Sequence, residues 1–134
     1  MKNFELTSDM STMGGVFYPK GYALVMLPSA QHAEQVAREL EGSATPPVEV
    51  MTLDPQTIFR DIGKLKDDSD IDLPSVGTEG ATVNKYVQLA RKGHHGLMVK
   101  VDSDEETETL MVAARKADFS YAQRYQLLAM QDLE

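Results

Sequence analysis

The 134-residue chain contains no cysteine. This absence excludes disulfide bonds, thiolate metal ligands and a cysteine nucleophile, and it is consistent with a reducing compartment. A chain of this length is expected to form one domain and to bury about 65–70% of the surface of its unfolded form, so it needs neither a disulfide nor a metal to fold. We expect no cofactor.

Long apolar runs are also missing from the chain. No stretch approaches the ~20 residues that a membrane-spanning helix requires. The first twenty residues carry Lys2, Glu5 and Asp9 and no apolar segment of the kind found in a secretory signal. We therefore expect a cytoplasmic protein that has no membrane partner.

An excess of basic residues is the third absence, because the protein is acidic, with a formal net charge of −8. Nucleic-acid binding usually depends on a basic patch that displaces counterions from phosphates. The short basic segment Lys64–Lys66 is followed at once by Asp67 and Asp68. We therefore expect no nucleic-acid partner, and the charge supports solubility.

The chain does contain one strand-then-helix pattern twice. The apolar runs Tyr22–Leu27 and Leu97–Val101 are each followed by a serine, Ser29 and Ser103, that suits a helix N-cap. Core-type residues then lie four, seven, eight and eleven positions after each serine. They are Ala33, Val36, Ala37 and Leu40 in the first copy and Thr107, Leu110, Met111 and Ala114 in the second. This repeat predicts two duplicated β-α-β halves.

The remaining elements complete the expected architecture. We expect a flexible N-terminal arm over residues 1–15 and a single domain over residues 16–134, with an insertion over residues 54–93. Strands are predicted near residues 48–53 and 122–130, and Asp54-Pro55 predicts a helix start. Two β-α-β halves in one sheet give an α+β, ferredoxin-like fold with a four-stranded antiparallel sheet and an inserted helical pair.

Both main helices are expected on one face of this sheet, because β-α-β crossovers are right-handed. The other face must then be covered by the inserted helices, by a second subunit or by a ligand. An uncovered face makes a homodimer the expected assembly.

Several segments carry a family resemblance. Pro74–Val83, together with Gly93–Gly96, resembles a family of small bacterial proteins of unassigned function, and Phe17–Pro19 and Phe119–Gln123 are similar to other parts of its pattern. The order of elements is more loosely similar to that of bacterial general-stress-protein domains. Some members of the family carry a riboflavin-biosynthesis name, but the cysteine cluster of a zinc-dependent GTP cyclohydrolase of that pathway has no counterpart here. The resemblance implies a fold and offers no reaction.

The segment Ser75–Thr82 is the first candidate binding site. Its glycines allow close backbone approach, its threonines add hydroxyls, and free N–H groups at a helix start suit a phosphate or carboxylate. Ordinary capping and packing is the alternative, and Glu79 beside the opening would repel an anion. The pattern lacks the Lys-Ser/Thr ending of a phosphate-binding loop. The candidate residues are Ser75, Gly77, Thr78, Gly80 and Thr82.

The pair His94-His95 and the turn containing Tyr18 and Lys20 are further candidates. Neighbouring residues of a strand point to opposite faces, so we expect one histidine as a ligand-binding or acid–base group and no metal held by both. Local hydrogen bonding at the strand entry is the alternative. Tyr18 and Lys20 could line the mouth of a pocket, or they could be an edge-strand aromatic with a solubilising lysine.

Three functions of different classes remain open from the sequence. The first is a non-catalytic ligand-binding or regulatory domain that holds a small anion or a protein partner near Gly77–Thr82 and His94. The second is a small dimeric ferredoxin-like enzyme that uses His94 or His95 as its acid–base group. The third is a structural oligomerisation module.

Overall fold

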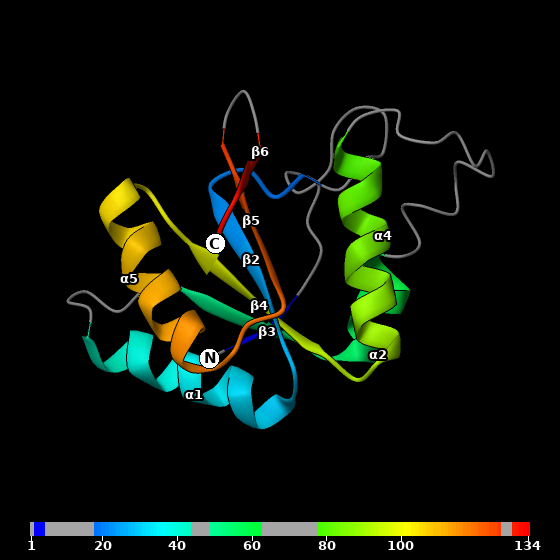
Figure 1. The fold of residues 1–134 in the computed structure, drawn as a ribbon, viewed down its shortest axis with the longest axis horizontal. Helices are drawn as coiled ribbons and strands as arrows, with labels where there is room; N and C mark the ends of the chain where they lie inside the picture. Colours follow the sequence, from blue (N-terminus) through cyan, green and yellow to red (C-terminus); the bar gives the residue numbers. More distant parts are fainter. Residues whose placement is uncertain (1, 5–17, 44–48, 63–77, 127–129) are drawn as a thin grey trace.

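Four antiparallel strands form the centre of the fold, in the order β3 (Val50–Leu53), β4 (His95–Lys100), β2 (Tyr22–Leu27) and β5 (Tyr121–Tyr125) (Figure 1). The computed structural model describes residues 2–4, 18–43, 49–62, 78–126 and 130–134. The predicted placement of both apolar runs in one sheet is confirmed, since β2 and β4 are hydrogen-bonded neighbours along their whole length. The α+β class and the antiparallel four-stranded centre are confirmed as well.

Two short strands extend the sheet beyond this centre, so it has six strands where we predicted four. At one edge β1 (Lys2–Asn3) pairs with β3 in parallel, and the adjacent Phe4 is buried. Residues 2–4, the part of the expected N-terminal arm that the structure describes, therefore lie on the sheet. At the other edge the predicted last strand is divided, because β5 ends at Tyr125 and β6 (Met130–Asp132) returns antiparallel beside it. A single strand over residues 122–130 was therefore wrong.

The two main helices begin at the predicted serines. The hydroxyl of Ser29 accepts a hydrogen bond from the backbone N–H of His32 at 3.3 Å, and α1 spans Ala30–Ser43. The hydroxyl of Ser103 accepts the N–H of Glu106 at 3.1 Å, and α5 spans Asp104–Lys116. Glu106 also reaches back as in a capping box, but its carboxylate accepts the N–H of Asp102, one residue before the Ser103 N-cap.

The inserted elements are α2 (Pro55–Thr57), a π-helical turn η2 (Ile58–Ile62) and α4 (Thr78–Arg91). Asp54 caps α2 as predicted, since its carboxylate accepts the N–H of Thr57 at 2.8 Å. No helix among the described residues is long and apolar enough to cross a membrane.

The sheet separates two apolar cores. On one face, residues of alternating strand positions such as Val25, Leu97 and Val99 pack against α1 and α5. Figure 1 shows these two helices together on the same side of the sheet, as predicted. On the other face, Leu24 and Met98 pack against η2 and α4. The inserted elements therefore cover the second face, and no subunit or ligand is needed to bury it.

Candidate ligand-binding groove

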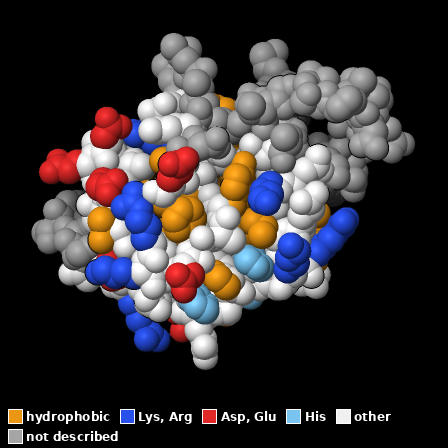
Figure 2. All heavy atoms as spheres, in the orientation of Figure 1, with side chains coloured by type: hydrophobic (Ala, Val, Ile, Leu, Met, Phe, Trp, Pro, Cys, Tyr) orange, Lys and Arg blue, Asp and Glu red, His pale blue; other side chains and the backbone are white. Residues whose placement is uncertain are grey.

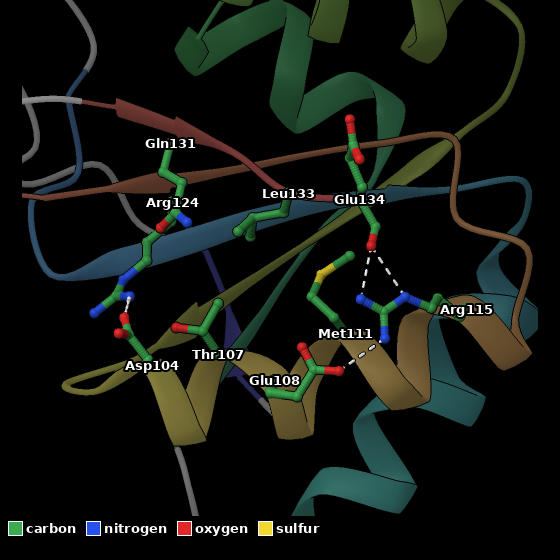
Figure 3. A pocket seen from close by; sticks show the side chains of 9 residues that line it. All are labelled: Asp104, Thr107, Glu108, Met111, Arg115, Arg124, Gln131, Leu133 and Glu134. Carbon is green, nitrogen blue, oxygen red and sulfur yellow. Dashed lines mark hydrogen bonds and ion pairs between the residues drawn. The ribbon is translucent and has the colours of Figure 1, made fainter.

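A groove of about 290 Å³ lies between α5 and the strand pair β5–β6 (Figure 3). It lies at the edge of the sheet, where the short strand β6 pairs with β5. The groove is lined by residues of α5, of β5 and of the chain that follows. They are Asp104, Thr107, Glu108, Met111, Arg115, Arg124, Gln131, Leu133 and Glu134.

Arg124 is the most unusual of the lining residues, because it places a guanidinium among buried groups. Its side chain is 10% exposed, and its Nη1 donates a hydrogen bond to Asp104 Oδ1 at 2.6 Å. The Asp104 side chain is 96% exposed. Among the described residues no buried side-chain nitrogen or oxygen lacks a hydrogen-bond partner. The Arg124 nitrogens that Asp104 does not contact therefore reach solvent, and Arg124 is one of the residues that line the groove.

Arg115 occupies the opposite end of the groove and is engaged by the chain itself. Its Nε and Nη2 both donate to the backbone oxygen of Glu134, at 3.0 and 2.7 Å. Its Nη1 donates to Oε1 of Glu108 at 2.9 Å. Figure 3 shows that this fork holds the end of the described chain against α5.

Two apolar side chains, those of Met111 and Leu133, line the groove among seven polar or charged ones. Leu133 packs against the α1–α5 core, which includes Met111, and its backbone N–H donates to the oxygen of Ala122 at 3.1 Å. Gln131 lies directly opposite Arg124 in the β5–β6 register. Directly opposed side chains of antiparallel strands share one face, with Cβ atoms about 4.5–5.5 Å apart. The Gln131 amide and the Arg124 guanidinium are thus neighbouring donors at one end of an apolar floor.

The charges around the groove are mixed. Three acidic side chains and two guanidinium groups line it. Figure 2 shows acidic and basic side chains alternating over the region of α5 and the C-terminal strand, with hydrophobic atoms between them.

The first predicted site, at the start of α4, is described only in part. Ser75 and Gly77 lie outside the described residues, and Thr78 and Gly80 belong to the first turn of α4. Thr82 is 3% exposed and belongs to the covered interior of the fold.

Tyr18 and Lys20 lie in the turn before β2. The Tyr18 hydroxyl donates to the backbone oxygen of Gln126 at 2.7 Å, and its ring packs edge-on against Tyr125 with centroids 5.0 Å apart. Lys20 is exposed, and its backbone N–H donates to the oxygen of Tyr18. Tyr18 thus contributes to the tyrosine-rich packing beside α4.

His94 and His95 lie at the opposite end of α4 from Thr82. The nine-residue step from Thr82 to Arg91 separates these ends by about 13 Å along the helix axis. The expected single site formed by the start of α4 and by His94 is therefore not brought together by the fold.

The two histidines have hydrogen-bonding partners of their own. His94 Nδ1 lies 2.9 Å from the Ser120 hydroxyl, which also donates to the backbone oxygen of Met26 at 3.1 Å. His95 Nδ1 lies 3.2 Å from the oxygen of Gly93. Burial lowers the pKa of His94, and the nearby charges of Lys92 and His95 lower it further.

These contacts favour the local-hydrogen-bond interpretation of the histidine pair. Among the residues that the structure describes, neither imidazole hydrogen-bonds a carboxylate that would orient it for acid–base chemistry. Within the described ranges, no group of three or more His, Asp or Glu side chains is placed to hold a metal ion.

The groove itself was not predicted, although the sequence holds one signal of it. Arg124 and Ala122 are two positions apart in a strand, so they share a face, and Ala122 is buried. A charged residue on the buried face of a strand requires a partner or a solvent channel.

Comparison with protein-family models, with curated proteins and with solved structures gives no match. The function must therefore be inferred from the geometry of the chain itself.

Proposed function

We propose that the chain is a non-catalytic ligand-binding domain and that the groove between α5 and β6 is its binding site. The observation that carries this proposal is the position of Arg124, a largely buried guanidinium that lines the groove and whose partner among the described residues is the exposed Asp104 carboxylate. Burying a guanidinium is costly unless its charge and its donors are satisfied. An almost fully exposed carboxylate, such as that of Asp104, compensates this cost weakly. A ligand in the groove supplies further hydrogen bonds to this guanidinium in place of water.

The size and lining of the groove also suit a small ligand. Binding pockets for small molecules combine apolar walls with a few convergent polar groups. Here Met111 and Leu133 provide the apolar wall, while Arg124 and Gln131 provide neighbouring donors. A volume of about 290 Å³ lies just below the usual range of ligand pockets, roughly 300–1,000 Å³, and so admits only a small ligand.

The test is a screen of small polar metabolites against isotope-labelled protein, read from the backbone amide shifts of α5 and β6. We expect at least one compound to shift these amides in the wild type and much less in Arg124→Gln. Arg38→Gln is the matched control, because Arg38 is an exposed arginine of α1 that pairs with Glu34 and does not line the groove. Compounds that bind elsewhere, with no dependence on Arg124, would contradict the proposal.

The enzyme alternative has less support. It requires His94 or His95 to be aimed into an enclosed site beside a second catalytic group. His94 instead pairs with Ser120. Ser120 joins the start of β5 to the end of β2, because its side chain and its backbone N–H both donate to the backbone oxygen of Met26.

We further propose that the two halves are a ferredoxin-like duplication in a cytoplasmic protein of the bacterial family that the sequence resembles. The strand order β3-β4-β2-β5 and the packing of α1 and α5 on one face support the duplication. The homodimer and the oligomerisation module have lost their physical basis, which was an uncovered sheet face. The buried contacts of α4 and η2 with that face remove the need for a second subunit.

A further inference from the structure

We propose that the ligand of the groove is a zwitterion with a small apolar side chain, the chemistry of a free apolar α-amino acid. This inference rests on the proposed binding function and specifies its ligand. It follows from the charges of the groove, from their spacing and from the apolar surface between them.

The charges exclude a simple ion. A plain anion that approaches Arg124 also meets the carboxylates of Asp104, Glu108 and Glu134, which outnumber the two guanidinium groups. A plain cation leaves the donors of Arg124 without a partner. A molecule that carries both charges satisfies the guanidinium and gains from the surrounding carboxylates, because each of its ends meets the opposite sign.

The spacing of the charges fits the two ends of an amino acid. The Arg124 guanidinium lies against Asp104, and Glu108 lies one helical turn further along α5. This turn amounts to about 6 Å along the axis. An α-amino group and its carboxylate carbon are only two bonds apart, so one small zwitterion can contact side chains that lie against neighbouring turns of α5 through a hydrogen bond at each end.

Both charged partners can accept the ligand. Asp104 is almost fully exposed, so its carboxylate can turn into water and release Arg124 without becoming a buried unpaired charge. Glu108 uses Oε1 for Arg115, and its Oε2 makes no hydrogen bond with the described residues. The ligand carboxylate is thus placed against Arg124 and the Gln131 amide, and its ammonium against Glu108 Oε2.

The apolar surface selects the side chain. Met111 and Leu133 lie between the two arginines in Figure 3, on the floor of the groove. A side chain of the size of leucine covers this surface and fits a volume of about 290 Å³. An acidic or basic side chain would instead be placed on apolar atoms, at a desolvation cost.

The test compares three probes on the full chain: L-leucine, N-acetyl-L-leucine, which lacks the ammonium, and L-leucinamide, which lacks the carboxylate. Binding is followed by the backbone amide shifts of α5 and β6. We expect L-leucine to bind about tenfold or more tightly than either derivative, because each derivative loses one charged hydrogen-bonded contact.

Two variants assign the contacts. Arg124→Gln should remove the preference of the protein for L-leucine over L-leucinamide. Glu108→Gln should remove the preference for L-leucine over N-acetyl-L-leucine. Arg38→Gln and Glu34→Gln are the matched controls, since both residues are on α1 and outside the groove. The dispersion of each variant's amide spectrum reports whether that variant is folded.

Each contrary outcome has a distinct meaning. Equal binding of N-acetyl-L-leucine would overturn the zwitterion in favour of a simple anion, and equal binding of L-leucinamide would overturn it in favour of a cation. If no leucine compound shifts the groove while another metabolite does so in an Arg124-dependent way, the inference fails and the proposed function stands. Binding that does not depend on Arg124 would overturn both.

Discussion

The hydroxyl pair of Tyr86 and Tyr125 gives the sharpest test of how the inserted helix covers the sheet. The two hydroxyl oxygens lie 2.7 Å apart, and the residues are 0% and 1% exposed. Tyr86 belongs to α4 and Tyr125 to β5, so this hydrogen bond joins the insertion to the sheet. Replacing either tyrosine by phenylalanine preserves the ring and removes one hydroxyl.

Each single variant should lower the free energy of unfolding by about 1–2 kcal/mol, because it removes a buried hydrogen bond and leaves its partner less well satisfied. The double variant should cost less than the sum of the two, with a coupling energy of about 0.5–1.5 kcal/mol. Urea denaturation of the four proteins gives these values.

A control cycle pairs Tyr86→Phe with Ser103→Ala, which lies at the N-terminus of α5 on the other face of the sheet. Its two effects should add to within about 0.3–0.5 kcal/mol. Additive effects of Tyr86→Phe and Tyr125→Phe would show that the hydroxyls do not interact, and would refute the packing of α4 on β5 described here.

Three further predictions concern caps and titration. Ser103→Ala should destabilise the protein by about 1 kcal/mol, because it removes the α5 cap. Thr109→Ala, on the exposed side of α5, should not destabilise it. Equal losses of unfolding free energy in the two variants, measured by urea denaturation, would contradict this prediction. Hydrogen bonds from Thr57 lower the pKa of Asp54. The stabilisation by this cap is therefore present above the unfolded pKa of about 3.9 and lost as the pH falls through the folded value. Asp54→Ala should cost about 1 kcal/mol at neutral pH and progressively less in acid, and Asp54→Asn, which keeps an acceptor but not the titrating carboxylate, should cost less at neutral pH and show the same decline in acid. The lowered pKa of His94 predicts an imidazole midpoint below about 6.5 by NMR, with stability lost as the pH falls through it; a midpoint at or above that value would contradict the burial of this ring.

The parts of the fold that the sequence predicted well depend on local signals. The apolar run of β2 and the helix starts at Ser29, Asp54 and Ser103 each follow from a few adjacent residues. The right-handedness of β-α-β crossovers also predicted α1 and α5 on the same face of the sheet, and both helices pack into one core there.

The parts that were missed depend on contacts between distant residues. The break between β5 and β6 depends on pairing of Arg124 with Gln131, and alternation in the sequence continues across it. The β1 pairing joins Lys2 to Met51, which no local pattern indicates.

The candidate site was missed for the same reason. The groove needs Arg124 beside Asp104, twenty positions earlier, and Arg115 beside Glu134. From the sequence we selected glycines and histidines as candidate site residues, because a short motif is enough to indicate that they could contact a ligand. An ion pair across two elements becomes visible only once the elements are placed.

Native mass spectrometry of gently purified protein tests the central claim, that the α5–β6 groove is a ligand site, most directly. Wild type and Arg38→Gln should retain the same small-molecule mass, and Arg124→Gln should lose it. A small-molecule mass retained equally by all three proteins would contradict the claim, because binding would then not depend on the guanidinium that defines the groove.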